Sequence, residues 1–313
     1  MTIPPTRPLR VGFLHPELGL GGAERLVVDA AVELQRRGHA VSIFTATHDT
    51  ARAFPETRDG TLRVEVHGGF LPTRIGGRLQ AACTAVRVSW AAVAMVRAGG
   101  FDAIVADLVP YALPVLRGLV RSRIKLVYYC HYPDQLLAPP RRGLYRLYRA
   151  PLDRLEVPSM RAADRVLVNS RYTAGILASL GGEAEVVYPG VDVEAYADVA
   201  AAPPGDAMFL VVGRFDPRKN LPLAIAALAR LRELDPAVFA TVRLVIAGGL
   251  DPSRPEDGEL AAGLVRQAAA LGVGDRVELV FSPTEPERLA LLGRCVAVIH
   301  AAVDEHFGLV PVE

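Results

Sequence analysis

The C-terminal segment of the chain carries two glutamates eight positions apart, Glu305 and Glu313. Between them, Gly308 allows a ligand to come close to the backbone, and Pro311 suits the first turn of a helix. Amides at a helix start bind anions, while carboxylates accept hydrogen bonds from hydroxyl groups. This combination fits a sugar nucleotide, which has both phosphates and hydroxyls. Two surface glutamates around a buried Phe307 are the alternative.

A loop at residues 212–220 carries the positive charge that such a ligand needs. Gly213 and Arg214 follow an expected strand, and Lys219 stands just before an expected helix. The arginine fork and the lysine point charge can contact a diphosphate from two sides. Lys219 is one of only two lysines in a chain with 33 arginines. Its presence at this turn favours a phosphate site over two solvated loop cations.

Two loops in the first half of the chain also lie where open α/β sheets bind ligands, after a strand and before a helix. One contains Gly21 and Gly22, but residues 19–22 have the spacing G-x-G-G rather than the dinucleotide fingerprint, so a tight turn without a ligand is the alternative. The other begins with His131 after an apolar strand and continues to Asp134. We expect His131 to face a ligand, because the carboxyl end of a parallel strand is the functional edge of the sheet.

Two segments could meet a membrane. In the first, arginine and tyrosine alternate, as suits an anionic lipid surface or a lipid pyrophosphate, although a solvated helix face fits equally well. Its candidate residues are Arg141, Arg142, Tyr145 and Arg146. The second, residues 79–96, is apolar but interrupted by Arg87. A core helix of an α/β domain is favoured there over a helix lying on a membrane.

Composition narrows the class of protein. The 313 residues are enough for two domains, and the net charge of +1 argues against nucleic acid as a partner. Residues 1–190 carry 24 Lys+Arg against 16 Asp+Glu, whereas residues 191–313 carry 11 against 18. The cysteines predict buried thiols in a reducing compartment. The sequence contains no cluster of His and Cys residues that would indicate a metal site. The N-terminus lacks an apolar signal segment, so we expect a cytoplasmic protein.

Strands and helices alternate along the whole chain, which predicts α/β domains with parallel sheets. Two doubly wound, Rossmann-like domains are expected, at 1–190 and 207–313, joined by a linker at 191–206. The second has four expected strands, fewer than such sheets usually carry, so it is expected to be incomplete. The expected strands are 10–15, 40–46, 62–67, 101–106, 124–130, 164–169, 185–188, 207–212, 242–247, 276–281 and 296–300.

The motifs together resemble a retaining GT-B glycosyltransferase of family four, group 1, whose signature is Glu-x7-Glu, here Glu305 to Glu313. Within that family the chain is most similar to the α-1,3/1,6-mannosyltransferases of lipid-linked oligosaccharide assembly, which serve N-glycosylation. The strings that carry this resemblance span nearly the whole chain: FLHPELGLGGAERLVVDAA, CHYPDQLL, LYRAPLD, VLVNSRYT, VIAGG and EHFGLVPVE.

The resemblance implies two domains facing a cleft, with GDP-mannose held mainly by the second. A polyprenyl or dolichyl diphosphate oligosaccharide acceptor would face the first domain, with the enzyme peripheral on the cytosolic face of a membrane. It implies no tightly bound cofactor and no essential metal. Arg214 and Lys219 would neutralise the leaving diphosphate. The remaining implied contacts are Glu305 and His131 to the transferred sugar, Glu313 to the ribose, and Gly21, Gly22, Gly213, Phe307, Gly308 and Leu309 to the donor.

In such retaining enzymes the leaving phosphate helps to take the acceptor proton, so we assign no protein nucleophile. Complete members continue past the second glutamate, so the chain is expected to be C-terminally truncated, which puts its own activity in doubt. Three alternatives stay open: another nucleotide-sugar glycosyltransferase of this fold, a NAD(P)-binding oxidoreductase, and an inactive fragment with a binding role.

Overall fold

The structure is a computed structural model. It describes residues 7–76, 78–138, 143–191, 193–196, 199, 207–250, 255–303 and 305–312. The chain divides into two compact units, Met1–Gly190 (unit 1) and Val191–Glu313 (unit 2), which we take in turn. Most of the expected linker at 191–206 lies outside the described residues.

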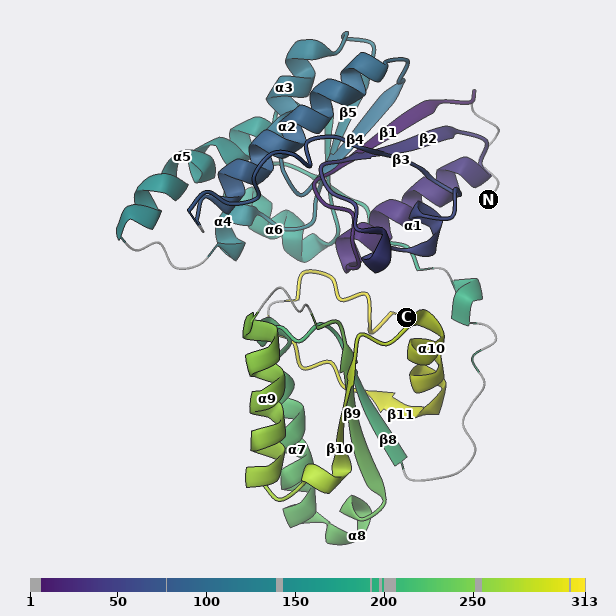
Figure 1. The fold of residues 1–313 in the computed structure, drawn as a ribbon, viewed down its shortest axis with the longest axis vertical. Coiled ribbons are helices and arrows are strands. Elements are labelled where there is room, and N and C mark those ends of the chain that lie inside the picture. The colour runs from purple at the N-terminus through teal and green to yellow at the C-terminus, as the bar shows by residue number, and fades with distance from the viewer. Residues whose placement is uncertain are drawn as a thin grey trace. The chain divides into compact units, whose positions relative to one another are not determined.

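Unit 1 is built on a seven-stranded parallel sheet in the order β3-β2-β1-β4-β5-β6-β7. The order reverses between β1 and β4, and at such a switch point the carboxyl ends of the strands border the ligand crevice. The strands are β1 (Arg10–His15), β2 (Ala40–Thr45), β3 (Arg63–Val66), β4 (Ala103–Asp107), β5 (Lys125–Cys130), β6 (Arg165–Val168) and β7 (Glu185–Val186). Figure 1 labels β1 to β5.

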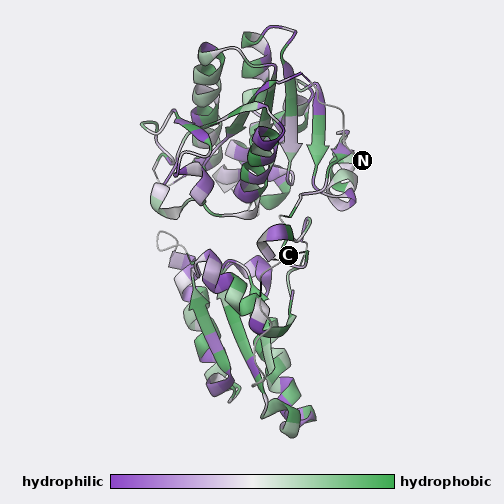
Figure 2. Cartoon of the chain, turned by 90° about the vertical axis from the view of Figure 1, so that its right-hand side faces the viewer, coloured by the Kyte–Doolittle hydropathy of each residue, from purple (hydrophilic) through white to green (hydrophobic). Residues whose placement is uncertain are grey.

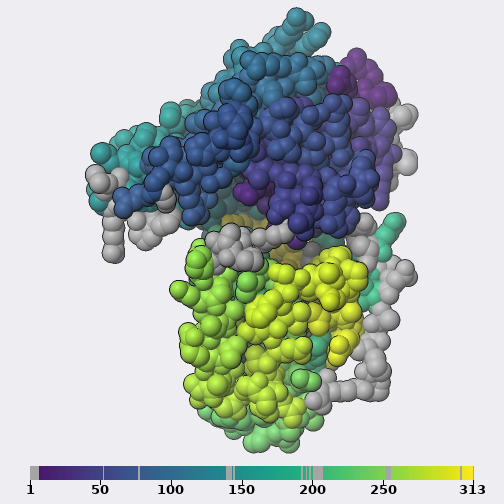
Figure 3. Space-filling view, viewed as in Figure 1, coloured from purple at the N-terminus to yellow at the C-terminus, as the bar shows by residue number. Residues whose placement is uncertain are grey.

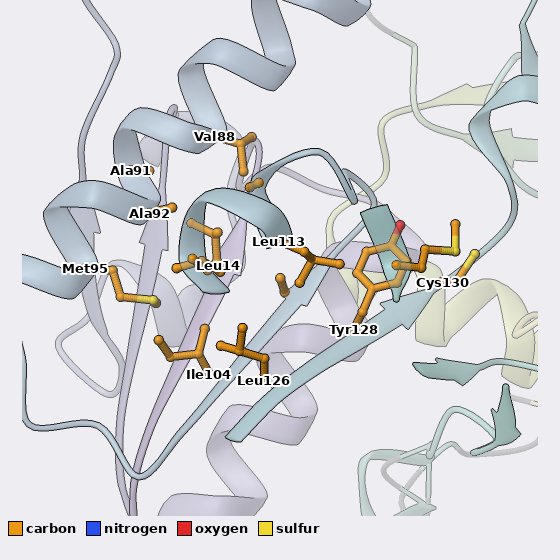
Figure 4. Close-up of a cluster of buried hydrophobic side chains, with 14 of the residues drawn as sticks. Leu14, Val88, Ala91, Ala92, Met95, Ile104, Leu113, Leu126, Tyr128 and Cys130 are labelled. Carbon is orange, nitrogen blue, oxygen red and sulfur yellow. The ribbon is translucent and has the colours of Figure 1, made fainter. Parts of the chain in front are cut away.

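Helices cover both faces of this sheet, as the connection of parallel strands requires. They are α1 (Gly22–Arg36), α2 (Gln80–Ala98), α3 (Ala112–Leu119), α4 (Asp134–Leu137), α5 (Gly143–Met160) and α6 (Arg171–Ser179), with the 3-10 turns η1 (Thr50–Arg52) and η2 (Pro55–Thr57). The larger core packs α2 and α3 against the central strands. Figure 4 shows Val88 and Met95 of α2 pointing toward Leu14 and Ile104 on the strands below. A second core packs α1 on β1 and β2.

Helix α2 is long and apolar enough to cross a membrane by length and composition, but a core helix passes the same test. Its inward face is buried at Val88, Ala91, Ala92 and Met95, which pack on the sheet. The segment therefore has the position of a core helix of an α/β domain. Its outward face keeps apolar side chains at the surface, with Trp90 46% exposed.

Unit 2 contains a four-stranded parallel sheet in the order β10-β9-β8-β11. Helices α7 and α9 pack on one face and α10 on the other (Figure 1). Figure 2 shows the strands as largely hydrophobic, as expected for a sheet covered on both faces. The elements are β8 (Ala207–Val212), β9 (Val242–Gly248), β10 (Val277–Phe281), β11 (Cys295–Val298), α7 (Leu221–Leu234), α8 (Pro236–Phe239), α9 (Pro255–Ala270) and α10 (Glu285–Arg294), with the 3-10 turns η3 (Val193–Tyr196), η4 (Pro217–Lys219) and η5 (Gly274–Arg276).

Pro311 lies in a turn in which the Val312 amide donates to the Leu309 carbonyl at 2.8 Å. The described residues end at Val312, so the expected helix start at Pro311 stays a prediction. One local expectation is wrong. Cys295 is only partly buried, unlike Cys83 and Cys130, because it begins an edge strand of its sheet.

Candidate active site

In unit 2, the carboxyl ends of β8 and β9 are in close backbone contact at two glycines, Gly213 and Gly248. A Cβ atom built on Gly248 would lie 1.6 Å from the carbonyl oxygen of Gly213, and Gly213 has φ +156°. The Phe215 amide donates to the Gly249 carbonyl at 3.0 Å, which closes the contact. Only glycine permits so close an approach, so this corner holds bare backbone at the edge where a ligand is expected.

Lys219 and Glu305, predicted as separate parts of a donor site, form an ion pair. Lys219 Nζ lies 2.5 Å from Glu305 Oε2, and each side chain is 28% exposed. The lysine stem crosses Gly213, where an added Cβ atom would lie 3.6 Å from the nearest lysine carbons. The structure therefore brings Gly213, Lys219 and Glu305 together.

His300 joins this pair, although the sequence reasoning did not select it. Its Nε2 lies 3.5 Å from Glu305 Oε2. Gly308, with φ +80°, packs over both: a Cβ there would lie 3.3 Å from Glu305 Cγ and 3.6 Å from His300 Nε2. The signal was present in the sequence, because His300 follows a strand at the carboxyl edge just as His131 does.

The other predicted residues of unit 2 differ in their surroundings. Arg214 is exposed, and no carboxylate among the described residues forms an ion pair with it. Asp216 instead pairs with Arg218 at 2.7 Å, and these hydrogen bonds hold the pKa of Asp216 well below its usual range. Arg214 thus keeps its charge available for an anion. The partly buried Phe307 and Leu309 flank Gly308, whereas Glu313 lies outside the described residues.

In unit 1, three polar side chains meet at the carboxyl ends of adjacent central strands. His15 ends β1, Asp107 ends β4, and His131 follows β5. His15 Nδ1 lies 2.8 and 2.9 Å from the two carboxylate oxygens of Asp107, and His131 Nε2 lies 3.1 Å from Asp107 Oδ2. Only His131 was selected from the sequence. His15 and Asp107 were missed because they close apolar strands, where a single polar residue gives no pattern.

His15 and Asp107 are buried, whereas His131 is partly exposed. Burial alone disfavours charge on His15 and Asp107, but their mutual attraction and hydrogen bonds outweigh it. The pKa of His15 is therefore raised and that of Asp107 lowered. Both shifts favour an imidazolium–carboxylate pair.

The backbone of His131 is fixed by the next strand. Asn169, directly after β6, donates from Nδ2 to the His131 carbonyl at 3.0 Å. Its Oδ1 accepts from Thr173 Oγ1 at 2.7 Å, and Ser170 caps the start of α6. Such a side-chain network holds a loop in one conformation.

The turn at Gly21 and Gly22 opens α1, and the Glu24 carboxylate lies against it. A Cβ built on Gly21 would lie 2.3 Å from Glu24 Oε2. The negative charge of Glu24 repels a phosphate at this turn but can accept a hydrogen bond from a hydroxyl group. A hydroxyl group therefore suits this turn better than a phosphate.

The candidate acceptor residue Asp134 is engaged within its own unit. It pairs with Arg149 at 2.7 Å, and Arg149 also pairs with Asp153 at 2.9 Å. The buried carboxylate of Glu156 accepts the backbone amides of Asp134 and Gln135 at 2.5 and 2.9 Å. These contacts fix α4 on α5, so a structural role accounts for Asp134.

The basic aromatic segment is described only in part. Tyr145 packs against Tyr148 with ring centres 5.8 Å apart, and Arg146 is exposed. Arg141 and Arg142 lie outside the described residues. Within the described ranges, no group of three or more His, Cys, Asp or Glu could hold a metal ion.

Comparison with family models gives matches along both units. Residues 20–195 match Glycosyltransferase Family 4, and residues 192–313 match Glycosyl transferases group 1. The chain belongs to Glycosyltransferase Family 4, whose model matches more than half of it. This membership confirms the expected family and makes the protein a hexosyltransferase.

Curated glycosyltransferases of the family align with almost the whole chain. The α-1,3/1,6-mannosyltransferase ALG2 of Homo sapiens is 38% identical over 318 residues, which cover 96% of this chain and 76% of that protein. The enzyme of the same name from Rhizomucor pusillus is 34% identical and covers 98% and 75%.

Solved structures confirm the fold of this family 4 glycosyltransferase. Sucrose-phosphate synthase from Thermosynechococcus elongatus superposes with a TM-score of 0.73 at 22% identity, over 97% of this chain and 78% of that one. Anabaena Alr3699/HepE, solved with UDP and glucose, gives 0.67 at 21% identity, over 96% and 77%. The expected GT-B architecture of two Rossmann-like domains is correct.

Proposed function

We propose that this glycosyltransferase moves mannose from GDP-mannose to a lipid diphosphate-linked oligosaccharide, forming an α-1,3 linkage, an α-1,6 linkage or both, with retention of configuration. Support comes from the identity to α-1,3/1,6-mannosyltransferases over almost the whole chain. The observation that carries the chemistry is the Lys219–Glu305 pair beside Gly213 and Gly308.

In this proposal the ion pair between Lys219 and Glu305 breaks when the donor binds. A diphosphate competes with Glu305 for the ammonium group of Lys219, and the released carboxylate accepts hydrogen bonds from the mannose hydroxyls. Arg214 meets the diphosphate from the other side. The amides of Phe307, Gly308 and Leu309 contact the donor, and Glu313 accepts from the ribose. Each component of the sugar nucleotide thus has a partner of matching chemistry.

The transfer step needs charge neutralisation and a proton acceptor. The bond between mannose C1 and the diphosphate oxygen breaks, and a new bond forms between C1 and the acceptor hydroxyl oxygen. The hydroxyl proton passes to the leaving diphosphate. Lys219 and Arg214 stabilise the negative charge that develops on the diphosphate, which is the largest contribution that fixed cations can make. His131, held by Asp107 and Asn169, faces the transferred sugar.

The lipid acceptor calls for a membrane surface, and unit 1 offers one. Phe70 and Trp90 are 72% and 46% exposed, with ring centres 5.4 Å apart, and Val86 on the same face of α2 is 58% exposed. Arg74 and Arg78 are exposed in the segment leading to α2. Figure 3 shows this part of the sequence, in dark blue, at the surface of unit 1. We propose that this Phe70–Trp90 surface lies on anionic lipids at the cytosolic face of a membrane.

A donor panel tests the proposed function. The full chain is incubated with a lipid diphosphate oligosaccharide and, separately, with GDP-mannose, UDP-glucose, UDP-N-acetylglucosamine or ADP-glucose, and products are identified by mass. We expect a gain of one or two hexoses with GDP-mannose alone. Transfer from another sugar nucleotide would overturn the donor assignment, and no transfer from any of them would overturn the proposed function.

A further inference from the structure

A buried charge network stands behind His131. His15 is fully buried, the Asp107 side chain is 3% exposed, and the His131 side chain is 15% exposed. The three lie at the carboxyl ends of β1, β4 and β5, and β4 lies between the other two in the sheet. Asp107 is the shared member, because its carboxylate contacts both imidazoles.

The geometry fixes where the ring protons lie. An ionised carboxylate only accepts hydrogen bonds, so each imidazole nitrogen that faces Asp107 must carry a hydrogen. Neutral His131 is therefore the tautomer with its hydrogen on Nε2. Its Nδ1 then keeps the lone pair and can accept a hydrogen bond.

The network also has to balance its charge. A carboxylate buried between two neutral rings would be an uncompensated charge, which proteins avoid. His15 is the better counter-ion, because its Nδ1 contacts both oxygens of Asp107, whereas His131 contacts only one. The Glu24 carboxylate also favours positive charge on His15, and the raised pKa of His15 agrees. Nε2 of His15 makes no hydrogen bond of normal geometry within the described residues.

Few other titratable groups face the network. Tyr129 packs its ring 4.9 Å from that of His131, and burial raises its pKa, so it stays neutral. Burial raises the pKa of Tyr128 on the same strand as well. The charge on His131 is therefore decided by Asp107 and by what neutralises Asp107.

We propose that His15 is a positioning residue for mannosyl transfer: as a buried imidazolium it neutralises Asp107, so that Asp107 fixes the tautomer of His131 without drawing a second proton onto it. His131 then offers a neutral Nδ1 lone pair to a hydroxyl of the transferred sugar. This inference rests on the proposed function only for the ligand that His131 meets. The proton arrangement itself belongs to the ligand-free chain.

Nitrogen-15 NMR of the imidazoles, on the full ligand-free chain, tests the arrangement without any need for activity. We expect His131 in the Nε2–H tautomer at pH 7. His15→Gln keeps a donor to Asp107 but removes the positive charge, so His131 should become protonated at a pH about one to two units higher. Asp107→Asn removes the negative charge and should move this protonation to lower pH. His39→Gln is the control, since that ring only accepts from the Leu9 amide.

The pH profile of kcat/KM is the second readout. The acidic limb should move to higher pH in His15→Gln and to lower pH in Asp107→Asn. In a His131→Ala background, His15→Gln should cause no further shift. An unchanged His131 titration in His15→Gln would overturn the inference, even if Asp107→Asn shifts it. If His15→Gln does not fold, nitrogen-15 NMR of the His15 ring in the unmodified chain decides, since a neutral His15 at pH 7 would overturn the inference. Absence of mannose transfer by the unmodified chain would instead count against the proposed function and leave the NMR result standing.

Discussion

Lys219 Nζ contacts Glu305 Oε2 at 2.5 Å although 86 positions separate the two residues in the chain. The two charges thus neutralise each other in the ligand-free unit. Under the proposed function, the cation contacts the diphosphate of the donor and the carboxylate contacts the hydroxyls of its sugar. Donor binding would then exchange this ion pair for two new sets of contacts.

Removing the lysine should damage transfer much more than stability. Lys219→Ala takes away a cation aimed at the leaving diphosphate, so kcat/KM for GDP-mannose should fall about 100-fold or more. The pair is partly exposed, so the free energy of unfolding should change by less than about 1 kcal/mol. Steady-state kinetics and urea unfolding measure the two effects. Lys125→Ala, at the only other lysine, is the matched control; equal losses in both variants would refute the assignment.

The backbone contact between β8 and β9 should be intolerant of a methyl group. Gly248→Ala places a carbon 1.6 Å from the Gly213 carbonyl oxygen, so one strand end has to move. We expect unit 2 to lose about 3 kcal/mol of stability or more. Gly258→Ala in α9 meets no atom within 4 Å and should stabilise the helix slightly. Urea unfolding compares them, and a Gly248→Ala protein as stable as the parent would contradict the close contact.

Glu156 should make stability depend on pH in an unusual direction. Burial raises its pKa from 4.5 to about 7, so the folded chain holds a proton that the unfolded chain releases between these values. Its contribution is therefore complete below about pH 4.5 and is lost as the pH rises to about 7, a change of about 3 kcal/mol.

Glu156→Gln should remove this slope. Unfolding free energies measured from pH 5 to 8 should fall less steeply in the variant than in the parent protein. Glu33→Gln, on the exposed face of α1, should leave the slope unchanged. Parallel curves for parent and Glu156→Gln would show that burial does not raise this pKa.

The Phe70–Trp90 surface should govern membrane binding. Phe70→Ser with Trp90→Ser removes two exposed rings, so binding to anionic lipid vesicles should weaken about tenfold or more, and high salt should weaken it further. Vesicle sedimentation measures this. Leu234→Ser with Val265→Ser removes comparable exposed apolar side chains from unit 2 and serves as the control. Equal losses in both double variants would mean that the surface is not specific.

The sequence predicted the regular elements well because local signals mark them. Gly21 and Gly38 bracket the first helix, and α1 runs from Gly22 to Arg36. Apolar runs of five or six residues likewise gave the central strands within two residues.

The site was less predictable because its contacts are distant in sequence. His15 and Asp107 meet only when β1 and β4 pair, and nothing local to either residue indicates the other. Asp134 was predicted to face a ligand, and nothing in its loop indicated the ion pair that it forms with Arg149, 15 positions further along the chain. Polar residues that satisfy one another inside the fold cannot be told from ligand-facing ones until their partners are known.

The amide of Asn169 joins the loop after β5 to the first turn of α6. A local opening that frees the His131 carbonyl therefore also releases the start of that helix, and the two segments exchange their amide hydrogens in one cooperative event. Any ligand that steadies His131 should then slow deuterium uptake in α6, which it does not have to touch.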